Sequence, residues 1–196
     1  MTSGTETLSH APARQQPAAV NRLIGVFLAV AVTGWGAAIF LTAVHLWALP
    51  LPAGIEPQGS LEVVTSSWAY IGPIPLALVG AGYYVLMMTL GALWLTMKDP
   101  RLERIMLPVT TIGLLSSIGL VYLQLGPIGA ICPFCMVSAT ATATLFMLEL
   151  AIKRLGGGIA SPPAAAARVW PALFVAAIGM AVLAMYGLTL APIPGT

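Results

Sequence analysis

The chain contains five long runs with almost no charged side chains, and these runs limit its fold more than any other feature. A helix needs about 20 apolar residues to cross the hydrocarbon core of a bilayer. Because lipid offers no hydrogen bonds, every backbone polar group must be satisfied within the span, so such runs form helices rather than open strands. The runs cover residues 23–49, 71–97, 105–125, 132–152 and 169–190.

The composition agrees with this interpretation, since 59% of the residues are hydrophobic and only 7% are charged. Soluble domains carry about 25% charged residues. So few charges exclude a soluble enzyme, a nucleic-acid-binding protein and a disordered chain. We therefore predict an all-α integral membrane protein with five transmembrane helices.

Every lysine and arginine lies on one side of the predicted membrane. The connections on the other side, residues 50–70 and 126–131 and the tail after residue 190, contain none. The positive-inside rule therefore predicts a cytoplasmic N-terminus and, with an odd number of spans, an external C-terminus. The cations are Arg14, Arg22, Lys98, Arg101, Arg104, Lys153, Arg154 and Arg168.

The only two cysteines stand three positions apart, in Cys132-Pro133-Phe134-Cys135, where the fourth span begins on the outer side. Residues at i and i+3 share one face of a helix, and a helix start favours the thiolate form. Cysteines in apolar helices can also be small buried hydrophobes. The placement favours a redox pair over simple packing. A metal site is not expected, because His10 lies in the N-terminal tail and His45 on another helix.

Two segments resemble the vitamin K epoxide reductase family. The stretch from Tyr122 to Cys135 (YLQLGPIGAICPFC) is similar to the end of the family's third helix and its active site. The stretch from Val64 to Leu78 (VTSSWAYIGPIPLAL) is similar to the segment that enters its second helix. The two matches have the family's order and lie on the expected side of the membrane, and the resemblance covers roughly residues 23–152.

This resemblance implies a four-helix bundle around a quinone, with the fifth helix peripheral to it. The expected organisation is a disordered cytoplasmic tail (1–20), the bundle (21–155) with its outer loop (50–70), a flexible inner linker (156–167), and the fifth helix with an outer tail (168–196). The linker is rich in glycine, proline and alanine, as flexible connections often are.

The resemblance also implies a function and roles for site residues. Electrons are expected to pass from a periplasmic thioredoxin-like partner through the cysteine pair to a quinone, ubiquinone or menaquinone, in a bacterial cytoplasmic membrane. By the family pattern Cys132 exchanges with incoming thiols and Cys135 faces the quinone, with Ser138 and Ala139 forming the floor of its pocket. Since Cys132 is nearer to the helix start, we also expect it to be the more accessible sulfur.

The chain departs from the family pattern in its outer loop, where a second cysteine pair normally relays electrons. The relay position nearest the second span is Ser60, and residues 52–55 contain no cysteine. Either the partner attacks the Cys132–Cys135 disulfide directly, or the protein is a non-catalytic subunit of a larger membrane complex.

Two polar residues in the spans have simpler interpretations. Glu149 stands four residues before Lys153, which predicts an ion pair at the inner membrane surface. His45 lies at the outer end of the first span, where we expect a hydrated interfacial side chain.

Overall fold

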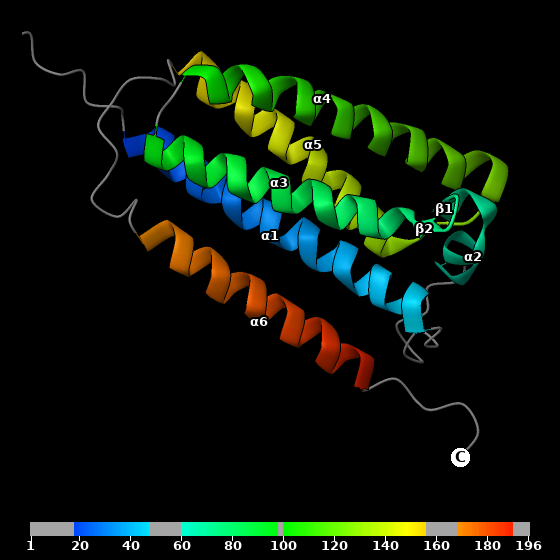
Figure 1. Ribbon diagram of the computed structural model, residues 1–196. Helices are drawn as coiled ribbons and strands as arrows, with labels where there is room; N and C mark the ends of the chain where they lie inside the picture. The colour runs from blue at the N-terminus through cyan, green and yellow to red at the C-terminus, as the bar shows by residue number, and fades with distance from the viewer. Residues whose placement is uncertain (1–17, 48–59, 98–99, 156–167, 190–196) are drawn as a thin grey trace, which may run out of the picture.

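The computed structural model describes residues 18–47, 60–97, 100–155 and 168–189, and these residues are almost entirely helical. Figure 1 shows the long helices side by side, with the short elements gathered at one end of the bundle. The long helices are α1 (Ala18–Trp47), α3 (Leu76–Met97), α4 (Pro100–Leu123), α5 (Pro133–Arg154) and α6 (Val169–Thr189). The short elements are α2 (Ser60–Thr65), the 3₁₀ turn η1 (Ser67–Ala69), strands β1 (Tyr70–Ile71) and β2 (Ile74–Pro75), and the π-helical turn η2 (Gln124–Ile128).

Four of the helical segments are long and apolar enough to cross a membrane. They cover Ala19–His45, Leu76–Met97, Arg101–Ile128 and Pro133–Arg154. The predicted all-α membrane architecture is confirmed. The fifth expected span is α6, in which the apolar stretch Val169–Leu183 is shorter than the other four.

The boundaries differ from the sequence prediction at two helix starts. Helix α1 begins at Ala18, so residues 18–20 of the expected tail are helical. Helix α3 begins at Leu76, because residues 70–75 form a hairpin in which Ile71 pairs with Ile74. Gly72 occupies the turn with φ of +61°, a conformation that favours glycine. The predicted tail at residues 1–17, the linker at 156–167 and the outer tail at 190–196 lie outside the described residues.

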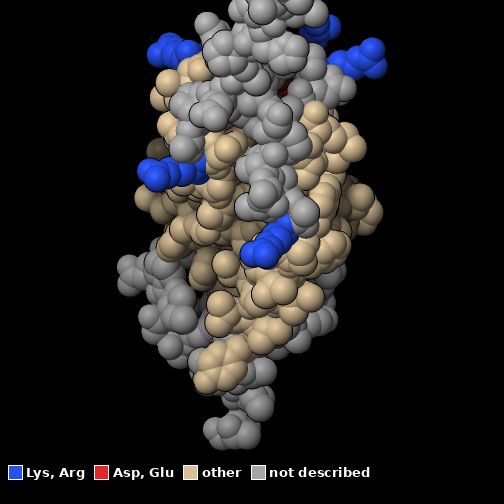
Figure 2. Space-filling view, turned by 90° about the vertical axis from the view of Figure 1, so that its left-hand side faces the viewer, with Lys and Arg blue, Asp and Glu red and all other residues tan. Residues whose placement is uncertain are grey.

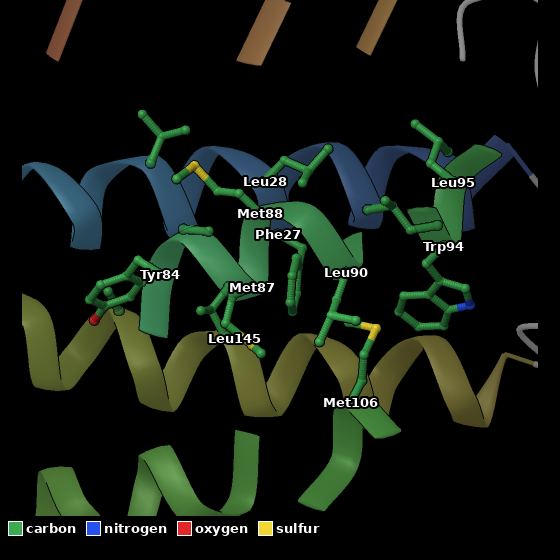
Figure 3. Packing of buried hydrophobic residues seen from close by; sticks show 14 of the residues in the cluster. Phe27, Leu28, Tyr84, Met87, Met88, Leu90, Trp94, Leu95, Met106 and Leu145 are labelled. Carbon is green, nitrogen blue, oxygen red and sulfur yellow. The ribbon is translucent and has the colours of Figure 1, made fainter. Parts of the chain in front are cut away.

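The core lies where α1 packs against α3 and α5. Met87 of α3 and Leu145 of α5 are fully buried and point into the space between their helices (Figure 3). Helices in lipid gain little from hydrophobic burial against each other, so close packing of side chains and backbones holds them together. Gly34 of α1 illustrates this close approach, because a Cβ at this position would overlap the ring of Tyr84.

Helix α6 lies along α1, on the side of the bundle away from α4 (Figure 1). Met180 packs over Gly36 of α1, and Leu173 also contacts the core cluster. Its large residues that face away from α1, including Phe174 and Val175, are mostly exposed, as expected of a helix surrounded by lipid. The prediction of four helices in a bundle with one peripheral helix agrees with this arrangement.

The described cations lie at the end of the bundle opposite α2. Figure 2 looks onto this end, where lysine and arginine side chains project around the helix termini. They are Arg22, Arg101, Arg104, Lys153, Arg154 and Arg168. The sequence pattern that places all cations on one side of the membrane therefore corresponds to one end of the structure.

The expected ion pair between Glu149 and Lys153 is wrong. Lys153 Nζ instead lies 4.0 Å from Glu103 Oε1 on α4. The Glu149 side chain is fully buried between α4 and α5, where its Oε2 accepts a 2.6 Å hydrogen bond from Thr110 Oγ1. Its Oε1 has no hydrogen-bond partner among the described residues. The helix face that carries Glu149 is turned toward α4, so the carboxyl group cannot reach the surface.

Candidate functional site

The Cys132–Cys135 motif begins α5 at the end of the bundle that carries α2. Cys132 is the N-cap residue, with extended backbone angles, and Pro133 occupies the first helical turn, where its missing N–H costs nothing. Cys132 C=O accepts the first hydrogen bond of the helix from Met136 N–H at 3.0 Å. The ring of Phe134 stacks on Phe40 of α1, with 4.5 Å between ring centroids. The helix start is therefore fixed against α1.

Gln124, which opens the π-helical turn, fixes the backbone on the other side of Cys132. Its side-chain Oε1 accepts the Cys132 N–H at 2.9 Å, and its main-chain carbonyl accepts the Ala130 N–H at 3.0 Å. Gly129 closes the turn with φ of +68°. The Gln124 side chain is buried, so these bonds are shielded from water and hold the loop before Cys132 in place. The sequence analysis missed this role, although Gln124 is the sole amide in the predicted third span.

The two thiols lie together but differ in their surroundings. Both cysteines are free, and the Cys135 thiol is hydrogen-bonded to that of Cys132. Cys132 is 0% exposed, whereas Cys135 is only partly buried. The expectation that Cys132 is the more accessible sulfur is therefore wrong for this conformation. The reason is tertiary packing, which a position near the helix start does not reveal.

Helix α2 supplies much of the cover over Cys132. Val63 and Val64 are both buried in the same cluster as Cys132, together with Phe40 and Leu41 of α1. The predicted relay position, Ser60, begins this helix. An incoming thiol can therefore reach Cys132 only when α2 moves away from the end of the bundle.

Alkylation rates are expected to reveal this cover. In single-cysteine variants, Cys132 should react with a maleimide about tenfold or more slowly than Cys135, because its reaction waits for local opening. Replacing Val63 and Val64 together by alanine should accelerate labelling of Cys132 and leave Cys135 little changed. The measurement is the alkylation rate in detergent micelles by mass spectrometry.

Glu62→Gln on the exposed side of α2 is the matched control and should leave both rates unchanged. Equal rates for the two cysteines in the starting variants would contradict the assignment of α2 as a cover.

A cavity of about 790 Å³, including its open mouth, lies beside the cysteine motif. It is enclosed by α1, α2, η1, α3, α4, η2 and α5, and its walls are mainly apolar. The lining residues are Leu41, His45, Val63, Val64, Ser66, Trp68, Ala69, Leu76, Ala77, Gly80, Ser117, Leu120, Val121, Leu123, Gln124, Ile128, Cys135, Ser138 and Ala139. Three predicted site residues, Cys135, Ser138 and Ala139, thus share one cavity wall, while Cys132 lies behind it.

Tyr84 connects the cavity to the core. Its hydroxyl donates to the Ser138 main-chain carbonyl at 2.6 Å and lies 3.0 Å from Ser138 Oγ and 2.9 Å from Thr142 Oγ1. The carbonyl can only accept, so the tyrosine proton is committed to it and the Tyr84 oxygen is left to accept from the other two hydroxyls. Figure 3 shows this hydroxyl against α5. The sequence analysis assigned Thr142 to helix packing alone and did not identify Tyr84.

His45 also differs from its expected environment. Its ring is half-buried on the cavity wall, 5.4 Å from the ring of Tyr70 in an edge-on arrangement. Its Nε2 is buried and has no hydrogen-bond partner among the described residues. The prediction of a hydrated interfacial side chain is therefore wrong.

Comparison with known proteins agrees with this geometry. A search of curated proteins finds no significant match. The sequence profile of the vitamin K epoxide reductase family matches residues 25–150, which include α1, α3, α4, the cysteine motif and most of α5. This match covers more than half of the chain, so the protein belongs to the vitamin K epoxide reductase family.

Proposed function

We propose that this protein is a membrane thiol–disulfide oxidoreductase that takes electrons from a periplasmic thioredoxin-like partner and passes them through Cys132 and Cys135 to a quinone. Membership of its family indicates a membrane thiol oxidoreductase. The observation that carries the finer proposal is the position of Cys135, which is hydrogen-bonded to Cys132 and also lines a largely apolar cavity.

The cavity fits a quinone headgroup in size and chemistry. Pockets for small ligands have volumes of about 300–1,000 Å³ and combine apolar walls with a few polar groups. Here the apolar walls include Leu120 and Val121, and polar atoms come from His45, Ser117 and Ser138. A quinone bound there supplies a two-electron acceptor.

The proposed exchange balances in two stages. A thiolate of the partner attacks the Cys132–Cys135 disulfide, and after a mixed disulfide the partner leaves oxidised and the pair becomes a dithiol. The pair returns to the disulfide by giving two electrons and two protons to the acceptor. The start of α5 assists both stages, because the exposed N–H groups of a helix N-terminus stabilise a thiolate.

The absence of loop cysteines determines how the partner must act. The chain has only two cysteines, so Ser60 cannot relay electrons by disulfide exchange. A partner thiolate must reach the motif itself, and Cys132 lies beneath Val63 and Val64. We infer that partner docking displaces α2 and exposes Cys132 for direct attack.

The proposed orientation follows from charge. The described cations lie at the end of the bundle opposite the cysteine motif, and lysine and arginine are enriched on the cytoplasmic side of membrane proteins. This supports a cytoplasmic N-terminus and an outer-facing motif in a bacterial cytoplasmic membrane. Disulfides form and persist in the periplasm, which suits a pair that oxidises a partner.

The redox state of the pair in native membranes tests the proposal. With quinone present, the pair should be mostly oxidised and resist alkylation, whereas quinone depletion should leave it reduced and alkylated. Restoring quinone should reverse the change. A pair that stays reduced under all three conditions would refute the proposed electron path.

The alternative is a non-catalytic subunit of a larger membrane complex, which the lack of relay cysteines favours. It predicts stoichiometric co-purification with that complex, whose activity Cys132→Ser would leave intact. Loss of electron transfer in the same variant favours the oxidoreductase.

A further inference from the structure

His45 stands out as a polar side chain on the cavity wall that no other part of the described chain uses. Its ring lies on the last turns of α1 and lines the same cavity as Cys135 and Ser138. The edge-on contact with Tyr70, at an interplanar angle of 79°, fixes the ring plane. The ring is therefore held in one orientation toward the cavity.

The hydrogen bond of the other ring nitrogen assigns the tautomer. Nδ1 lies 2.7 Å from the main-chain carbonyl of Leu41. A carbonyl oxygen only accepts hydrogen bonds, so Nδ1 carries the proton and donates it. In the neutral ring Nε2 then holds a lone pair and can only accept.

The Nε2 lone pair requires a donor that the described chain does not provide. The atom is buried, and no described polar group lies within hydrogen-bonding distance. Native proteins leave few buried polar atoms unsatisfied, because each one loses its hydrogen bonds to water without replacement. Since His45 lines the cavity, a molecule bound there is positioned to supply the missing donor.

We propose that His45 Nε2 accepts a hydrogen bond from a hydroxyl group of the reduced, quinol form of the ligand. This inference rests on the proposed function for the identity of the ligand. A quinol carries hydroxyl donors, whereas the carbonyl oxygens of a quinone only accept and would face the Nε2 lone pair without a bond. His45 is thus a specificity-determining residue that favours the reduced ligand over the oxidised one.

Binding of both ligand forms tests this proposal without turnover. The protein carries Cys132→Ser and Cys135→Ser, so no electrons are exchanged, and the probes are a short-tailed ubiquinol and its quinone form. His45→Phe keeps an aromatic ring against Tyr70 but removes the acceptor. The loss of one hydrogen bond should weaken quinol binding about tenfold. Quinone binding should change less than about twofold, and His45→Gln, which retains an acceptor, should preserve more of the quinol affinity.

Nitrogen NMR provides a second readout on the unaltered His45 ring. The chain has two histidines, so His10→Gln leaves His45 as the single ¹⁵N-histidine signal. The Nε2 resonance should move upfield when the quinol is added and stay nearly unchanged with the quinone. This measurement remains decisive if His45→Phe fails to fold.

The outcomes separate the two proposals. If both probes bind and neither their affinities nor the Nε2 resonance depends on His45, the role of His45 is refuted while the proposed function stands. An Nε2 resonance already shifted upfield without ligand would mean that water satisfies the nitrogen, and would also refute it. If neither probe binds, the quinone function itself is refuted along with this inference.

Discussion

Replacing Cys135 by alanine is expected to reduce thiol-dependent quinone reduction by on the order of a thousandfold or more, to the rate measured without protein. Cys135 lines the cavity, and the chain has no other thiol besides Cys132. A single remaining sulfur cannot form the intramolecular disulfide that transfers two electrons. The measurement is the absorbance change of a short-tailed quinone, with purified protein and a reduced thioredoxin-like partner.

The companion variants identify the cause of the loss. Cys132→Ser should abolish turnover equally, because the disulfide needs both sulfurs, yet Cys135 should remain open to alkylation. Val137→Ala, at a largely exposed position on the same helix, serves as the matched control and should retain normal turnover. Appreciable activity of Cys135→Ala would contradict the assignment of the pair as the redox centre.

The second large effect is expected at Gly34. A Cβ here would overlap the ring of Tyr84, which is buried and anchored to Ser138 and Thr142 by its hydroxyl. Gly34→Ala should lower the free energy of unfolding by about 3 kcal/mol, because overpacking forces side chains and backbone apart. Gly34→Leu should prevent the bundle from folding. Thermal unfolding followed by near-ultraviolet circular dichroism in detergent measures both effects.

Gly25 provides the control for this prediction in the same helix. A Cβ at Gly25 meets nothing within 4 Å, so Gly25→Ala should leave stability nearly unchanged. Combining Gly34→Ala with Tyr84→Leu should cost less than the sum of the two single changes, because the smaller side chain relieves the overlap. Additive losses, or equal losses for the two alanine variants, would show that the close approach of α1 and α3 is not the cause.

The sequence predicted the features that depend on neighbouring residues. Uncharged runs located the helices, and the positions of Cys135, Ser138 and Ala139, three and four residues apart, placed them on one helix face. The structure confirms that these three residues line a common cavity. A helix repeat is a local property, so it can be read from one segment alone.

The features that the sequence did not reveal depend on which helix faces which. Each span is apolar on all sides, so its pattern gives no direction toward the core. The burial of Glu149 against Thr110, the bond from Cys132 N–H to Gln124 and the cover of α2 over Cys132 all join separate segments. The local spacing of Glu149 and Lys153 suggested a different partner, because it contains no information about α4.

The buried carboxyl of Glu149 has a consequence for how the chain enters the bilayer during synthesis. An acidic side chain disfavours the insertion of an isolated helix by up to about 3 kcal/mol at the helix centre and by less toward its ends. The donor for this carboxyl, Thr110, lies on α4, and only residues 124–132 separate α4 from α5. A hairpin of these two helices can satisfy Oε2 of the carboxyl as it leaves the translocon, whereas α5 alone cannot. The pairing of Thr110 with Glu149 thus favours insertion of α4 and α5 as one unit.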